Sequence, residues 1–192
     1  MKCNFDGKVA VVTGASRGIG EATVRQLDEG GANLVLVSRS TDKLKGIAAE
    51  LKNDSLVVDC DLSADFSIDL IRNRTMEKFE KIDILVNNAA IERNEPAHRA
   101  TAAAIDETLL VNLRQAFMLC SAFAKDLFAT QGNIVNVSST AAGGAGGTQG
   151  AYAASKGGLN TLSKNLSNEW GNKGVRVNSV APGLCLTEMW EP

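Results

Sequence analysis

Residues 8–20 read KVAVVTGASRGIG, and this stretch decides the fold class. Its first six residues are rich in valine and predict a buried strand. The glycines that follow are spaced as Gly14-x-x-x-Gly18-x-Gly20, which allows a tight turn, close approach of a pyrophosphate and close packing of a helix on the strand. A helix beginning at Gly18 presents free N–H groups and a positive dipole end to phosphates. The stretch therefore predicts a dinucleotide-binding turn between a strand and a helix.

The rest of the chain repeats this alternation of apolar strands and amphipathic helices. Strands are expected at residues 8–13, 33–38, 55–59, 82–87, 133–138 and 175–180, and helices at residues 18–30, 41–53 (with Thr41 as N-cap), 64–80, 107–130 and 151–172. Near-continuous apolar strands separated by helices are typical of a parallel sheet covered on both faces. The expected fold is α/β, a doubly wound, Rossmann-like parallel sheet of about six strands, in one domain over residues 1–192.

Composition excludes several classes of function. The net charge of −2 gives no basic patch for nucleic acid, and no apolar run approaches the roughly 20 residues that a membrane span needs. Four widely spaced cysteines and a polar N-terminus indicate reduced thiols and no signal peptide, so the cytoplasm is the default location. His98 is the sole histidine, and the carboxylates Asp59 and Asp61 have no third partner, so no metal site is expected.

The end of the second expected strand bears on the choice of cofactor. NAD binders usually place an acidic residue there to hold the ribose 2′-OH, whereas this chain has Ser38-Arg39-Ser40. Arg39 could donate two N–H groups to a 2′-phosphate, and Arg17 in the glycine turn could add a second cation. The pattern favours NADP(H) over NAD(H), although either arginine could instead be a solvated surface charge.

Tyr152-Ala153-Ala154-Ser155-Lys156 opens the helix that follows an Ala/Gly-rich loop. Tyrosine and lysine at i and i+4 share one helical face. A free tyrosine, with a pKa near about 10, is a poor base at neutral pH. A neighbouring ammonium is expected to lower that pKa, which makes Tyr152 a candidate general acid and base. Ser139, at the end of the fifth strand, could polarise a substrate carbonyl.

Taken together, these motifs resemble the short-chain dehydrogenase/reductase family across nearly the whole chain. The matching positions are Thr13-Gly14-x-x-x-Gly18-x-Gly20, Asn87-Asn88-Ala89, Asn112, Ser139, Tyr152-x-x-x-Lys156, Asn178 and Pro182-Gly183, in the order typical of the family. The resemblance implies hydride transfer between a nicotinamide and a carbonyl or alcohol substrate. It also implies a homo-oligomer, built from the helices over residues 107–130 and 151–172.

The resemblance further implies a role for each matching residue. Tyr152 exchanges a proton with the substrate oxygen, Ser139 orients that oxygen, and Lys156 holds the nicotinamide ribose and lowers the tyrosine pKa. Asn112 lies at an irregularity of its helix and anchors a water that relays protons to Lys156. The implied cofactor contacts are Gly14, Ser16, Arg17, Gly18, Ile19, Gly20, Ser38, Arg39, Asp61, Leu62, Asn87, Ala89, Tyr152, Lys156, Pro182, Gly183 and Thr187.

Two departures from the family pattern matter. Ala90 stands where the family usually has glycine, which costs about 1 kcal/mol if that position needs a positive φ. The sequence also stops ten residues after Pro182, so the usual substrate lid and last strand are expected to be missing and the sixth strand to lie at a sheet edge. The alternative to an enzyme is therefore a catalytically inactive nucleotide-binding or interaction isoform.

Overall fold

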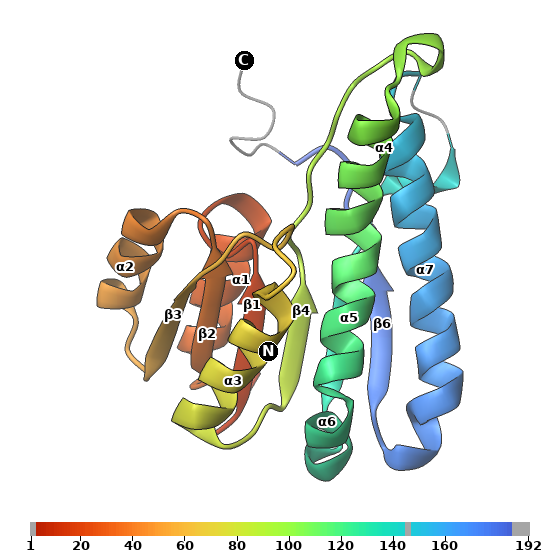
Figure 1. Ribbon diagram of the computed structural model, residues 1–192. Coiled ribbons are helices and arrows are strands. Elements are labelled where there is room, and N and C mark those ends of the chain that lie inside the picture. Colours follow the sequence, from red (N-terminus) through yellow and green to blue (C-terminus); the bar gives the residue numbers. More distant parts are fainter. Residues whose placement is uncertain (1–2, 145–146, 186–192) are drawn as a thin grey trace.

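All six strands of the computed structural model form one parallel sheet (Figure 1). The structure describes residues 3–144 and 147–185. The strands are β1 (Val9–Thr13), β2 (Asn33–Ser38), β3 (Ser55–Asp59), β4 (Ile84–Asn87), β5 (Asn133–Val137) and β6 (Arg176–Val180). They are ordered β3-β2-β1-β4-β5-β6, so the chain reverses its direction of travel across the sheet between β1 and β4. This confirms the predicted doubly wound sheet, whose ligands bind beyond the strand ends at such a switch point.

Helices cover both faces of the sheet (Figure 1). They are α1 (Gly18–Glu29), α2 (Thr41–Glu50), α3 (Ser67–Phe79), α4 (Ala102–Leu109), α5 (Gln115–Ala122), α6 (Ala124–Thr130) and α7 (Gly150–Trp170). On one face, α1 and α2 bury residues such as Val24 and Leu44 against the sheet. On the other, α3, α5, α6 and α7 bury residues such as Ile71, Phe123 and Leu166.

The central and edge strands differ in burial, and the difference follows from their neighbours. All five residues of β1 are buried, because strands flank it on both sides and helices cover both faces. In β6, Val177 is buried, whereas the four other residues, including Val180, are exposed. The sixth strand therefore lies at an edge of the sheet, as expected from the sequence.

The helix expected over residues 107–130 is the clearest error of the sequence analysis. Helix α4 begins five residues earlier, at Ala102, because the Thr101 hydroxyl accepts a hydrogen bond from Ala104 N at 3.2 Å and caps the helix. The segment Leu110–Arg114 is π-helical, and Phe123 separates α5 from α6. Helical periodicity did not reveal these breaks, because π-helical turns retain helical side-chain spacing to a first approximation.

A second correction concerns the start of α2. Ser40, and not Thr41, is the N-cap residue, and neither side chain caps the helix. The Thr41 hydroxyl instead donates to the carboxylate of Asp59 at the end of β3. Within the described ranges, none of the helices is both long enough and apolar enough to cross a bilayer.

Candidate active site

A cavity of about 590 Å³ lies at the carboxyl ends of the strands. Its walls come from the turn after β1, from the ends of β2 and β3, and from the segments that follow β4, β5 and β6. Fifteen of the expected catalytic and cofactor-binding residues line it: Gly14, Ser16, Arg17, Gly18, Ile19, Ser38, Arg39, Asp61, Leu62, Ala89, Ser139, Tyr152, Lys156, Pro182 and Gly183. The fold thus brings residues from opposite ends of the sequence to one site.

The glycine turn is packed so closely that it has no room for a side chain at Gly14 or Gly20. Gly14 has φ +65°, and a Cβ there would lie 2.9 Å from the backbone of Ala89. A Cβ on Gly20 would lie 2.1 Å from the carbonyl oxygen of Gly14. No side chain caps the first turn of α1, so its N–H groups point toward the cavity as donors for a phosphate. These features fit a bound dinucleotide.

Hydrogen bonds hold this turn against the end of β4. The Thr13 hydroxyl accepts from Asn88 N at 3.0 Å and from Ala89 N at 3.1 Å. The amide nitrogen of Asn88 donates to the carbonyl oxygens of Thr13 and Gly14 at 2.9 and 3.1 Å. Because β1 and β4 flank the switch point, these bonds fix both walls of the cavity relative to each other.

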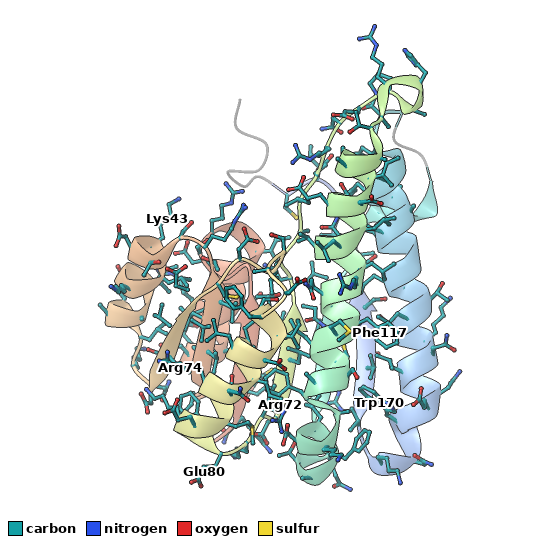
Figure 2. The ribbon with its side chains drawn as sticks, in the orientation of Figure 1. Lys43, Arg72, Arg74, Glu80, Phe117 and Trp170 are labelled. Atoms are coloured by element: carbon teal, nitrogen blue, oxygen red, sulfur yellow. The ribbon has the colours of Figure 1, made fainter. Side chains whose placement is uncertain are left out.

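Three basic side chains, Arg17, Arg39 and Lys43, line one end of the cavity. Figure 2 shows Lys43 on the first turn of α2, at the sheet edge where the strands end. Arg39 forms an ion pair with Asp61 at 3.6 Å, and both side chains are largely solvated. Hydrogen bonds from Ser63 are the main cause that lowers the pKa of Asp61. An exposed ion pair of this kind is weak, so Arg39 can turn toward an anion at little cost.

Ser139, Tyr152 and Lys156 line the other end of the cavity. Tyr152 and Lys156 lie one turn apart on the buried face of α7, with the ammonium 5.7 Å from the centre of the phenol ring. The Lys156 ammonium donates to the carbonyl oxygen of Val137 at 2.6 Å. The Ser139 hydroxyl accepts from Ala141 N at 3.1 Å and lies near enough to the Tyr152 phenol to act on its pKa. The expected catalytic side chains are therefore in mutual reach.

The pKa values of this pair differ from the sequence-based expectation. The pKa of Tyr152 is raised, because burial outweighs the hydrogen bond from Ser139, and the charge of Glu92 adds to the increase. Burial lowers the pKa of Lys156 to about 8. Lys156 is not among the groups that shift the pKa of Tyr152, so the lowering expected from the neighbouring ammonium is not found.

Asn112 lies in the π-helical segment, which confirms the expected helix irregularity. Its side chain is buried and clamps the backbone of Ile91, accepting from Ile91 N at 2.8 Å and donating to Ile91 O at 2.9 Å. It also donates to the Ser155 hydroxyl at 3.1 Å. The Asn112 side chain therefore joins the loop after β4 to α7, directly behind the cavity.

Some expected contacts lie behind the cavity wall or outside the described residues. The Asn87 side chain is buried and donates to Asn136 at 2.8 Å, so only its backbone can face a ligand. Gly20 acts through packing against Gly14. Thr187 lies outside the residues that the structure describes. Ala90 is not among the non-glycine residues with positive φ, so the strain considered for it does not arise.

The sequence analysis missed Glu92 and Gln149, which both line the cavity. The Gln149 amide donates to the Glu92 carboxylate across the space beside Tyr152. Gln149 stands three residues before Tyr152 and is the N-cap residue of α7. That spacing was the one available signal, since a residue one turn before a catalytic tyrosine shares its side of the helix.

Known proteins are similar to this chain in sequence and in structure. A family model described as short chain dehydrogenase matches residues 8–192. D-threitol dehydrogenase from Mycolicibacterium smegmatis is 39% identical over 189 residues, which cover 96% of this chain and 73% of that protein. The Escherichia coli 3-oxoacyl-(acyl-carrier-protein) reductase is 34% identical over 187 residues, covering 97% of this chain and 77% of that protein. The crystal structure of a metagenomic short-chain oxidoreductase in complex with NADP superposes with a TM-score of 0.89 at 38% identity, over 94% of this chain and 84% of that one.

Proposed function

This chain belongs to the short-chain dehydrogenase family, and from that membership and the geometry of its cavity we propose that it is an NADP(H)-dependent oxidoreductase acting on a carbonyl/alcohol pair. One observation carries the proposal. A single cavity has Ser139, Tyr152 and Lys156 at one end and three basic side chains at the other. This arrangement favours a working enzyme over the inactive nucleotide-binding isoform.

Tyr152 acts as the general acid and base. During reduction its phenol donates a proton to the substrate oxygen, and during oxidation the phenolate takes that proton back. The raised pKa of Tyr152 keeps the phenol protonated at neutral pH, which suits the reductive direction. The cofactor, when bound, supplies or accepts the hydride.

Ser139 and Lys156 support this proton transfer. Ser139 acts on the pKa of the phenol and lines the cavity with it, so its hydroxyl can orient the substrate oxygen beside Tyr152. Lys156, with its pKa near 8, holds a positive charge at neutral pH and can bind ribose hydroxyls. The Asn112 side chain is already hydrogen-bonded to Ile91 and Ser155, so any proton relay at Asn112 runs through its backbone carbonyl.

The choice of NADP(H) rests on charge. The segment after β2 has no carboxylate, and Arg17, Arg39 and Lys43 line the cavity there. We expect a 2′-phosphate to replace Asp61 as the partner of Arg39, because the phosphate carries more negative charge and accepts two N–H groups of the guanidinium at once. The relative crystallised with NADP agrees with this choice.

A fluorescence titration tests the cofactor. We expect NADPH to bind at least about tenfold more tightly than NADH, and Arg39→Ala to remove most of that difference. Arg74→Ala, an exposed arginine on α3 away from the cavity (Figure 2), is the matched control and should change neither affinity. Equal binding of the two cofactors by the parent chain contradicts the assignment.

Tyr152→Phe tests the chemistry. The variant should lose at least about 10²–10³-fold in kcat and retain NADPH binding, because only the phenolic oxygen is removed. Thr161→Val, which removes an exposed hydroxyl from the same helix, should keep the parent activity. Full turnover by Tyr152→Phe contradicts the role proposed for Tyr152.

We further propose that the chain forms a homo-oligomer through α5 and α7. Phe117 and Met118 on α5 are 49% and 43% exposed, although both are large and apolar (Phe117 is labelled in Figure 2). Exposed apolar side chains side by side favour a protein–protein contact. Light scattering should give more than one chain per particle for the parent and a lower mass for Phe117→Ser, and an unchanged mass for this variant refutes the proposed contact.

A further inference from the structure

The charges of the large cavity are distributed unequally along its length. One end carries the three basic side chains described above together with the carboxylate of Asp61, whereas the end beside Tyr152 carries the ammonium of Lys156 and the carboxylates of Glu92 and Glu107. Arg93 pairs with Glu107 and compensates its charge. The hydrogen-bond partner of Glu92 is the neutral amide of Gln149, which brings no opposite charge to this carboxylate.

Both members of this pair are held by rigid elements. The two hydrogen bonds between the Asn112 side chain and the Ile91 backbone fix the residue just before Glu92 against the π-helical segment. Gln149 begins α7, and its carbonyl oxygen accepts from Ala153 N at 2.8 Å. The positions of Glu92 and Gln149 relative to Tyr152 are therefore set by the same helices that set the catalytic side chains.

The hydrogen-bonding groups left on this pair match hydroxyls. Glu92 has a second carboxylate oxygen, which only accepts, and Gln149 has a carbonyl oxygen and a second N–H. A substrate hydroxyl can donate to the Glu92 carboxylate oxygen or the Gln149 carbonyl oxygen, and it can accept from the Gln149 N–H. A carboxylate or phosphate on the substrate only accepts, and Glu92 repels it.

From this geometry we infer that Glu92 and Gln149 form a subsite for neutral, hydroxyl-rich substrates such as polyols and diols, and that Glu92 disfavours substrates with an anionic group next to the reacting carbon. This inference rests on the proposed function. Glu92 and Gln149 are specificity-determining residues in it, and Tyr152 remains the group that exchanges the proton.

The test uses three four-carbon substrates that share a 2,3-diol and differ at one end, which is hydroxymethyl, carboxylate or aminomethyl. Their kcat/KM values are measured with saturating NADP⁺. The parent should prefer the hydroxymethyl substrate over the carboxylate by about tenfold or more. Glu92→Gln should remove most of this preference, and Glu92→Lys should reverse it. Preference for the aminomethyl substrate by the parent overturns the inference, because Glu92 then selects a cation.

Glu95→Gln is the matched control. It removes the same charge three residues away, from a side chain that lines a separate, smaller pocket. It should leave the substrate preference unchanged, and a loss of preference equal to that of Glu92→Gln overturns the inference, because a general charge effect then explains it.

Binding measurements distinguish a failure of the subsite from a failure of the proposed function. Calorimetry with Tyr152→Phe and NADP⁺ reports binding of the three compounds without turnover. If the parent turns over no alcohol or ketone, the proposed function fails. The subsite then stands or falls on whether the hydroxymethyl compound binds about tenfold more tightly than the carboxylate, and equal binding of the two refutes it.

Discussion

Replacing Gly20 with alanine should force α1 away from the turn that precedes it. The added Cβ would lie 2.1 Å from the carbonyl oxygen of Gly14, whereas real Cβ contacts are essentially never under 3.0 Å. The backbone therefore has to move by about 1 Å, and no change of rotamer can relieve the contact because the opposing atom belongs to the main chain. Overpacking costs about 1–3 kcal/mol. Alanine regains about 0.5–1 kcal/mol of helix propensity.

Because backbone must move, the overpacking cost should lie near the upper end of its range. After the gain in helix propensity, the expected net loss in the free energy of unfolding is about 2 kcal/mol. Urea unfolding measures it, and an unchanged m-value shows that stability alone has altered. NADPH affinity should fall in parallel, by about tenfold, because the displaced helix start no longer meets the phosphates at the same distance.

Gly46→Ala is the control for this prediction. Gly46 lies inside α2, is exposed, and a Cβ there would meet no atom within 4 Å. This variant should be more stable than the parent by about 0.5–1 kcal/mol. If Gly20→Ala is as stable as Gly46→Ala, the close packing of α1 on the glycine turn does not limit this fold, and the reasoning is refuted.

Three further predictions follow from single side chains. Asp83→Asn should lose about 1–3 kcal/mol near pH 7, because the buried Asp83 carboxylate accepts from Lys8 at 2.8 Å. Burial acts to raise the pKa of Asp83, but its hydrogen bonds lower the pKa overall. The stabilisation is therefore lost as the pH falls through the pKa of the folded state. A difference in the free energy of unfolding between parent and variant that does not change with pH contradicts this. Glu80→Gly should raise the free energy of unfolding by about 1 kcal/mol, because Glu80 (labelled in Figure 2) is the C-cap residue of α3 and has φ +61°, which glycine adopts without strain. Thermal unfolding measures the change, and an unchanged stability refutes the strain. Glu92→Gln should lower the pKa of Tyr152, which ultraviolet titration reports directly because it is the sole tyrosine, and an unchanged midpoint argues against the coupling.

The sheet and the candidate residues Tyr152 and Lys156 were accessible from sequence for a physical reason. Each strand is a short run of apolar, β-branched residues, and the glycine spacing at Gly14, Gly18 and Gly20 is tied to one turn geometry. The four-residue spacing from Tyr152 to Lys156, about one helical turn, places both on one face whatever surrounds the helix. Local rules therefore sufficed for these features.

The breaks in the long helix and the pKa of Tyr152 were not accessible in this way. Within the π-helical segment, the Asn112 side chain binds Ile91, a residue that comes from the loop after β4. The pKa of Tyr152 depends on how deeply α7 is buried and on the charge of Glu92, which is distant in sequence. Both depend on contacts between separate segments.

The sequence by itself therefore determined the α/β class and the glycine turn between the first strand and helix, since each follows from spacing within a single strand, turn or helix. The candidate catalytic side chains came from the resemblance to a family. Only the tertiary structure decided which side chains share the cavity with them. The pairing of Arg39 with Asp61, and of Glu92 with Gln149, joins segments that are separated along the chain. Their distances are set by how the helices pack on the sheet, which no local pattern in the sequence encodes.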